Sequence, residues 1–449
     1  MALFGTSGVR GPVGETVTAA LALDVGRAVG ADLAARGEPR RAVVGRDPRD
    51  SGRLLVDALA AGLRETGTDV IDLGVASTPT VARAVGWEEA GVGVAVTASH
   101  NPAPDNGIKL WQPSGQAYDE PRRTEIERRV DEGADDLEAW DGLGDRTTAD
   151  ATERHADRLV TAVDGGVVEA ADLDVVVDVG NGAGGVTVEA LSELGCHVET
   201  LNAQPDGTFP GRPSEPTAEN CTSLSALVRE SDADLGIAHD GDADRLRAVA
   251  GDGTFLSGDA TLALFAGAAA DEGERVAVPV DTSLAVEDYL AKRGVGVERT
   301  PVGDVYVAAA AAEAGVAFGG EPSGAWIWPD ETLCPDGPYA ACKLVELAAE
   351  RPLAERAAAL PSYPIRRDAV EVAEKAAVME RVREHTLEAF DSVTTLDGVR
   401  VETDEGWFLL RASGTQPLVR VTAEAREEER MEELFETARA IVDDAVGQN

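Results

Sequence analysis

Residues 91–102 read GVGVAVTASHNP, a β-branched apolar run that passes directly into a polar turn. The same arrangement recurs along the chain, and Ala-rich helical stretches such as 18–33, 54–66 and 259–270 separate the apolar runs. This alternation predicts parallel sheets with helices on both faces. Since ligands of such sheets bind at the carboxyl ends of strands, we expect the turn at 97–102 to lie at a site.

The pattern changes near residues 361–364, where the alternation ends. A short strand-like run, a long helix at 375–389, two further strand-like runs and a charged helix follow. The sequence predicts an α/β fold of four domains around a central cleft: three related α/β domains with mixed sheets and a smaller C-terminal α+β domain. The predicted boundaries are 1–148, 149–251, 252–363 and 364–449.

The charge of the chain is strongly negative, with 82 acidic residues against 40 basic ones and a net charge of −42. Such a surface repels itself at low salt, and molar salt screens this repulsion because the Debye length falls to about 3 Å. The composition indicates a halophilic, haloarchaeal-like protein; the alternative is an ordinary acidic protein. It disfavours nucleic acid as a partner, because phosphate binding needs a basic face.

The remaining composition indicates a cytoplasmic protein. The four cysteines are scattered and form no C-x-x-C pair, which is typical of a reducing compartment. The N-terminal residues lack a signal-peptide pattern, and the longest apolar stretches are far shorter than the roughly 20 residues of a membrane span. We expect no membrane association, and a monomer or a homodimer.

Residues 240–245 read DGDADR and lie between two apolar runs. Asp240, Asp242 and Asp244 alternate, and in a loop this spacing can direct three carboxylates at one Mg²⁺ ion. An EF-hand is excluded because Arg245 and Gly251 stand where that loop needs Gly and Glu. A solvated acidic turn is the open alternative.

The turn at 97–102 carries a candidate nucleophile, Ser99. A serine hydroxyl needs a base, a metal or an anion site to activate it, and His100 and Lys109 lie nearby in the sequence. A serine hydrolase is disfavoured, because Thr97 and Asn101 stand where G-x-S-x-G requires glycine. A plain polar turn is the open alternative.

Two further loops suit a phosphorylated sugar. Residues 411–417 (RASGTQP) place a Ser-Gly-Thr turn beside Arg411, with Arg420 close behind, and arginine binds phosphate through two hydrogen bonds. Residues 319–324 (GGEPSG) offer Glu321 and Ser323 to sugar hydroxyls. Ordinary turns remain the alternative for both loops.

Residues 178–185 (DVGNGAGG) match the dinucleotide-binding pattern G-x-G-x-x-G, with Glu199 at a distance suited to a ribose. That pattern has many false positives in a chain with 48 glycines. No second signature of a nicotinamide site accompanies it, so a dehydrogenase is disfavoured.

Taken together, these motifs resemble the α-D-phosphohexomutase superfamily, which comprises phosphoglucomutases, phosphomannomutases and phosphoglucosamine mutases. The resemblance covers nearly the whole chain and keeps the order of the superfamily's motifs. Its motifs are FGTSGVRG (4–11), the run from TASHNP to NGIK (97–109), PDGTFPGRPSEPTAEN (205–220), DGDADR, PVGDVYV (301–307), GGEPSG and RASGTQP.

The resemblance implies an isomerase that interconverts hexose 6-phosphate and hexose 1-phosphate through a phosphoserine at Ser99 and a hexose bisphosphate intermediate. It implies Mg²⁺ at Ser99, Asp240, Asp242 and Asp244. The other residues for which it implies a role are Lys109, Arg245, Arg10 and His100 in catalysis, and Glu321, Ser323, Gly303, Asp304, Arg411, Ser413, Gly414, Thr415 and Arg420 in substrate binding.

The sequence also departs from patterns common in the superfamily. Gln416 replaces a frequent Glu, and Ala325 replaces a frequent His after the glycine of the sugar loop. Dual-specificity members often carry a His near Asp304. These departures favour phosphoglucosamine mutase over phosphomannomutase or phosphoglucomutase. A non-catalytic sugar-phosphate binding protein is the alternative of another class.

Overall fold

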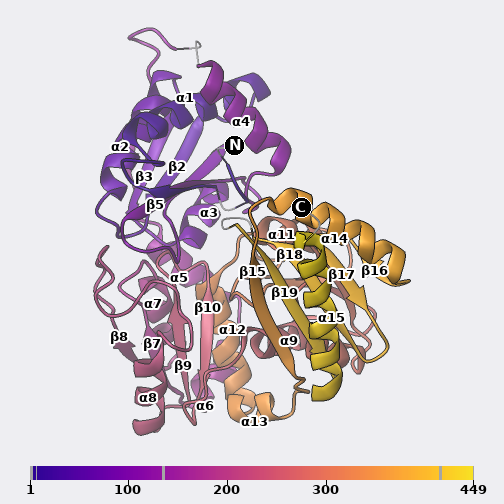
Figure 1. Cartoon of the computed structure of the whole chain (residues 1–449). Helices are drawn as coiled ribbons and strands as arrows, with labels where there is room; N and C mark the ends of the chain where they lie inside the picture. The colour runs from indigo at the N-terminus through magenta and orange to yellow at the C-terminus, as the bar shows by residue number, and fades with distance from the viewer. Residues whose placement is uncertain (1–3, 7, 134–136, 414–416, 448–449) are drawn as a thin grey trace.

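The computed structural model describes residues 4–6, 8–133, 137–413 and 417–447, and it contains four sheets, each in its own part of the chain (Figure 1). The first part, domain I, has a six-stranded mixed sheet in the order β1-β5-β4-β2-β3-β6, in which β5 runs antiparallel to β1 and β4. Its elements are β1 (Val9–Pro12), α1 (Ala19–Arg36), β2 (Arg41–Arg46), α2 (Gly52–Glu65), β3 (Asp69–Val75), α3 (Thr78–Trp87), β4 (Val92–Val96), β5 (Asp105–Trp111), α4 (Glu120–Glu132) and β6 (Arg146–Thr148).

The second part, domain II, has a four-stranded sheet in the order β10-β9-β7-β8, with β10 antiparallel to β9. Its two inner strands are mostly apolar and buried, as expected for strands covered on both faces, whereas the edge strand at 197–201 is largely exposed. The elements are α5 (Thr152–Thr161), α6 (Gly165–Ala171), β7 (Asp174–Asp178), α7 (Gly185–Glu193), β8 (His197–Leu201), α8 (Thr222–Glu230), β9 (Leu235–His239) and β10 (Leu246–Ala250).

Domain III repeats this plan, with the sheet order β12-β11-β13-β14 and an antiparallel last pair. Side-chain caps set several of its helix starts: Ser257, Ser283 and Asp336 each accept a hydrogen bond from a backbone N–H of the first turn. The elements are α9 (Gly258–Ala269), β11 (Arg275–Pro279), α10 (Leu284–Ala291), β12 (Gly296–Thr300), α11 (Asp304–Ala311), β13 (Val316–Gly320), β14 (Trp326–Ile327), α12 (Gly337–Glu350) and α13 (Leu353–Ala358).

Domain IV differs from the other three, because its five-stranded sheet, in the order β15-β19-β18-β17-β16, is wholly antiparallel. In Figure 1 its two long helices lie over this sheet. The elements are β15 (Ile365–Glu371), α14 (Lys375–Ala389), β16 (Val393–Thr394), β17 (Val399–Glu402), β18 (Gly406–Ala412), β19 (Leu418–Ala425) and α15 (Glu428–Gly447). The predicted fold class is confirmed; the domain boundaries at 148, 251 and 363 stay predictions.

The hydrophobic cores show how the domains are joined. One continuous core contains residues of both domain II and domain III, for example Val177 and Ile237 beside Phe265 and Trp326. Domain IV has its own core, and a small cluster of Val280, Trp407 and Leu409 connects it to domain III. Domain IV, like the first domain, therefore has a main core of its own.

All four cysteines are buried and free. Within the described ranges, no helix has both the length and the apolar character needed to cross a lipid bilayer.

Candidate functional site

Ser99 lies where β4 ends, at a buried turn between domains I and II. It adopts a left-handed backbone with φ of 49°, and only 1% of its surface is exposed. Its hydroxyl donates a hydrogen bond of 2.6 Å to Oδ2 of Asp240 and lies 3.2 Å from Nδ1 of His100. Ser99 and Asp240 are 141 positions apart in the sequence. The fold therefore joins the candidate nucleophile to the candidate metal loop.

His100 is uncharged in this setting. Burial, and then the charges of Arg245, Arg10 and Arg49, lower the pKa of its imidazole to about 2. Because the Ser99 hydroxyl donates its one proton to Asp240, it can only accept a hydrogen bond from His100, in the tautomer that carries a proton on Nδ1. No carboxylate lies within 4 Å of the His100 ring in the described parts of the chain.

The three aspartates occupy the turn between β9 and β10, and all three are buried. One ligand atom from each lies within 4.8 Å of the others. Oδ1 of Asp242 and Oδ1 of Asp244 are buried and accept no hydrogen bond from any residue that the structure describes. Burial, followed by the charges of its two aspartate neighbours, raises the pKa of Asp240; burial and Asp242 raise the pKa of Asp244 to about 6.

These aspartates fit a divalent cation. Crowded, buried carboxylates with unpaired oxygens are costly without an opposite charge, and oxygen ligands are those that Mg²⁺ prefers. Thr78, at the start of α3, donates a hydrogen bond of 2.6 Å to Oδ2 of Asp242 and so orients that carboxylate. Thr78 was not among the predicted site residues. It is the first residue of a helix capped by Ser77, and nothing in that sequence context indicates a metal site.

A cavity of about 270 Å³ opens beside Ser99 and brings together loops from all four domains. Its lining contains four cationic side chains and three carboxylates. The cations suit a phosphate, and the carboxylates suit sugar hydroxyls or an amine. Its charged and polar lining residues are Arg10, Lys109, Arg245, Arg411, Asp244, Asp304, Glu321, Ser99, Ser323 and Thr6, and Gly303 contributes backbone. Most of the predicted site residues are thus neighbours.

Lys109 and Asp304 form an ion pair across this cavity, between β5 of domain I and α11 of domain III. The Lys109 ammonium also lies 4.5 Å from the centre of the Trp111 ring. Burial would raise the pKa of Asp304, but the charge and hydrogen bond of Lys109 outweigh it and hold the pKa below its usual value. The cleft thus keeps a charged pair at its centre.

Glu321 follows β13 and faces the same cavity. Its Oε1 accepts a hydrogen bond of 2.8 Å from the backbone N–H of Gly303, and its Oε2 accepts one of 3.3 Å from Ser323. Burial, and then the negative charge of Asp304, raises the pKa of Glu321 to about 7. This carboxyl therefore changes charge near neutral pH.

Arg411 connects domain IV to the cleft. Its guanidinium lies 3.3 Å from Oδ2 of Asp397, an oxygen that also accepts the backbone N–H of Val302 in domain III. Arg411 and Arg420 are cross-strand partners and line a second cavity of about 380 Å³ together with Arg367. Ser413 is buried beside them; the predicted Gly414 and Thr415 lie outside the described residues.

The glycine-rich stretch at 178–185 follows β7 and leads into α7, as the dinucleotide pattern predicts. Other parts of the protein approach two of its glycines closely. A Cβ on Gly180 would lie 2.6 Å from Nη2 of Arg212, and one on Gly182 would lie 2.7 Å from the carbonyl oxygen of Gly241. Gly180 therefore leaves room for Arg212, and Gly182 leaves room for the backbone of the loop at 240–245.

Comparisons with known proteins agree with this architecture. The phosphoglucomutase/phosphomannomutase family models match in order: alpha/beta/alpha domain I at residues 1–136, domain II at 153–253, domain III at 257–363 and the C-terminal domain at 369–441. A protein of Methanosarcina barkeri named "Probable phosphoglucosamine mutase" is 46% identical over 452 residues, covering 99% of this chain and 100% of the relative. A Methanopyrus kandleri protein of the same name is 46% identical over 96% of this chain and 95% of its own.

A crystal structure of a phosphoglucomutase/phosphomannomutase family protein from Burkholderia thailandensis superposes with a TM-score of 0.88 at 29% identity, covering 99% of this chain and 97% of that one. The chain belongs to the phosphoglucomutase/phosphomannomutase family, and it is an isomerase of the phosphohexomutase class.

Proposed function

We propose that this isomerase is a phosphoglucosamine mutase that interconverts glucosamine 6-phosphate and glucosamine 1-phosphate. Relatives of that name align with essentially the whole chain, and the cleft offers Asp304 and Glu321 to an amino sugar. The observation that carries the proposal is the 2.6 Å hydrogen bond between the Ser99 hydroxyl and Asp240. It supports the proposal because the Ser99 hydroxyl then lies both beside three clustered carboxylates and at the wall of a cavity of about 270 Å³.

Ser99 is the residue that we expect to carry the phosphoryl group between turnovers. The phosphate passes from Ser99 Oγ to O1 of glucosamine 6-phosphate, which makes the 1,6-bisphosphate. After that intermediate has turned over in the cleft, its 6-phosphate passes to Ser99 and leaves glucosamine 1-phosphate. In the first step Lys109, in its neutral form, is the proposed acceptor of the O1 proton, and the departing Ser99 oxygen takes up a proton. In the second step the Ser99 hydroxyl gives up its proton as it attacks, and O6 leaves as a hydroxyl.

The rest of the cleft supplies positioning and charge, which dominate phosphoryl transfer. Asp240, Asp242 and Asp244 would hold Mg²⁺, which when bound neutralises charge on the phosphate oxygens. Arg245 and Arg10 face the same space, while Arg411, Ser413 and Arg420 would bind the phosphate that is not being transferred. A hinge at 361–364 would let domain IV follow the two orientations of the intermediate. The protein would act in the cytoplasm, as a monomer or a homodimer.

A ³¹P NMR time course tests the proposal. The protein is dissolved in molar KCl, because its net charge of −42 is screened there, together with Mg²⁺ and a trace of hexose bisphosphate. Glucosamine, mannose and glucose 6-phosphates are added in separate experiments. A 1-phosphate signal that grows fastest with glucosamine 6-phosphate is the expected result. A faster reaction with mannose or glucose phosphate would overturn the sugar assignment. No signal from folded, Ser99-phosphorylated protein would favour a binding protein.

A further inference from the structure

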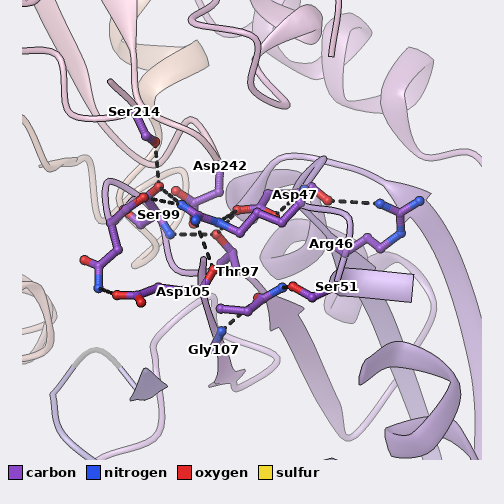
Figure 2. Close-up of polar contacts among 12 residues, drawn as sticks. Arg46, Asp47, Ser51, Thr97, Ser99, Asp105, Gly107, Ser214 and Asp242 are labelled. Atoms are coloured by element: carbon purple, nitrogen blue, oxygen red, sulfur yellow. Dashed lines mark hydrogen bonds and ion pairs between the residues drawn. The ribbon is translucent and has the colours of Figure 1, made fainter. Parts of the chain in front are cut away.

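A fully buried ion pair lies behind Ser99 and uses none of the residues assigned to the reaction above. Arg49 and Asp47 follow β2, neither side chain is exposed, and Nε of Arg49 lies 2.8 Å from Oδ2 of Asp47. The pair packs against the turn that carries Ser99, on the side of its backbone carbonyls. Figure 2 shows Asp47, Thr97 and Ser99 close together within this network.

The Arg49 guanidinium holds the backbone of the Ser99 loop at four points. Its Nη2 donates to the carbonyl oxygens of Ser99 (2.9 Å) and Asn101 (2.7 Å). Its Nη1 donates to those of Pro102 (2.5 Å) and Asp105 (3.0 Å). All five N–H groups of the guanidinium are therefore used. Only a planar fork can serve four carbonyls and a carboxylate at once, since an ammonium has three donors at a single point.

Asp47 holds the other backbone polar group of Ser99, its N–H, through Thr97. Its Oδ2 accepts a hydrogen bond of 2.7 Å from the Thr97 hydroxyl, which in turn accepts one of 2.8 Å from the backbone N–H of Ser99. The N–H of Ser99 is thus tied to Asp47 and its C=O to Arg49. This matters because Ser99 has φ of 49°, a region that residues other than glycine seldom adopt without support from their surroundings.

Domain II closes this network from the opposite side. Ser214 donates a hydrogen bond of 2.8 Å to the Ser99 carbonyl (Figure 2). The Arg49 guanidinium carbon lies 4.9 Å from the centre of the Phe209 ring. Both residues belong to the loop at 205–216, which has no other role assigned above. The position of Ser99 is therefore fixed from two domains.

We propose that Arg49 is a positioning residue for phosphoryl transfer, which holds the loop at 99–105 so that the Ser99 hydroxyl points at Asp240 and the cavity. This inference rests on the proposed role of Ser99. A small displacement of the reacting oxygen is costly, because a misplacement of about 1 Å can reduce a rate by about 100-fold. Arg49 would thus act on the transfer step and leave the binding of the free sugar phosphate unchanged.

The test compares Arg49→Lys and Thr97→Val with Arg46→Ala in the holoenzyme. Arg46 precedes Asp47, and its Nη1 donates a hydrogen bond of 3.1 Å to the carbonyl oxygen of Asp47. We expect kcat to fall by about 100-fold in Arg49→Lys and by about 10-fold in Thr97→Val. In both variants, KM for the sugar phosphate should stay within about two-fold of wild type. Arg46→Ala should match wild type in both constants.

Loading of Ser99 from glucose 1,6-bisphosphate, followed by phosphopeptide mass spectrometry, is measured in parallel and should slow by the same factors. This readout does not depend on which sugar is turned over, so a wrong sugar assignment leaves the test intact. If Arg49→Lys does not fold, the isosteric Thr97→Val carries the test. Loading and kcat within about three-fold of wild type in a folded variant would overturn the proposal, as would a rise in KM alone.

Discussion

The loop that carries Ser99 is buried between two domains, whereas the arginines of domain IV face a cavity of about 380 Å³. In the first region, one guanidinium satisfies four carbonyls of the loop. In the second, Arg420 is exposed, and Arg411 pairs with Asp397 at 3.3 Å. The contrast agrees with the proposed roles: a nucleophile would need a fixed position, whereas arginines that bind two orientations of one ligand would need room to move.

The attachment of domain IV supports the same contrast. Domains II and III share one apolar core, whereas domain IV meets domain III through a small apolar cluster and a set of polar contacts. Glu424 accepts hydrogen bonds from Ser283 and from the backbone N–H of Leu284, and Arg426 pairs with Asp288 at 2.9 Å. Polar interfaces of this kind are consistent with relative movement of domains.

The largest effect is expected from Ser99→Ala. Removal of the nucleophile should lower kcat by about 1,000-fold or more, while the melting temperature changes little because only one hydrogen-bonding hydroxyl is lost. Steady-state kinetics and thermal unfolding measure the two quantities. Ser323→Ala removes the same atom from the opposite side of the cavity and is the matched control. Equal losses in the two variants would contradict a special role for Ser99.

The next largest effect is expected from Asp242→Asn. Loss of one carboxylate charge should weaken Mg²⁺ binding by about 100-fold or more, since even outer-shell changes cost 10–100-fold. Without metal, the same variant should be more stable than wild type, because the buried like charges repel each other less. Calorimetric titration with Mg²⁺ and unfolding in EDTA test both claims.

Asp252→Asn is the control for the metal site, because Asp252 lies exposed in the turn after β10 and accepts the backbone N–H of Thr254. EDTA should lower the melting temperature of this control as much as that of wild type. If Asp242→Asn responds to Mg²⁺ and EDTA as the control does, the cluster is a structural acidic turn.

A smaller effect is expected from Arg420→Ala in the more open region. Loss of one charge-assisted hydrogen bond at an exposed position should raise KM for the sugar phosphate by about 10-fold and change kcat by less than about three-fold. Arg439→Ala, which breaks an exposed pair with Asp368 on the other side of β15, should leave both constants unchanged. A large fall in kcat at unchanged KM would contradict this expectation, because it would show that Arg420 acts on the transfer step and not on binding.

The smallest effect is a pH-dependent change in stability from Glu321→Gln. The folded-state pKa of Glu321 is raised to about 7 from an ordinary 4.5, so the stability it contributes is fully present below pH 4.5 and is lost as pH rises through 7. Gln mimics the protonated form. The variant should match wild type near pH 5 and exceed it by roughly 2 kcal/mol near pH 8. Denaturant unfolding at both pH values measures this difference, and an equal difference at both would refute the assignment.

Most of the fold was predictable, because its signals are local. The run at 92–96 and the helix at 375–389 appear in the structure as β4 and α14 with those bounds. The motif residues Ser99 and Asp240 carry recognisable chemistry wherever they lie. Their 2.6 Å contact was not predictable from spacing, because it depends on how two domains pack.

Arg49 and Thr78 were missed for a related reason. Each acts through a backbone carbonyl or another side chain, so its residue type gives no sign of a ligand. Arg49 reads as an ordinary arginine in a chain where 40 residues are basic. Only its complete burial and its four carbonyl partners show its importance. The sequence could not tell whether Gly180 and Gly182 bind a dinucleotide or serve packing. In the structure, Arg212 lies beside Gly180 and the backbone of Gly241 lies beside Gly182.

The central claim is that Ser99 passes a phosphoryl group to the sugar phosphate. It is tested most directly by loading Ser99 with ³²P, mixing the protein with excess glucosamine 6-phosphate and following the label in a rapid-quench experiment. We predict that the label leaves Ser99 for a sugar bisphosphate at a rate no slower than kcat. Label that stays on Ser99 while glucosamine 1-phosphate accumulates would contradict the claim.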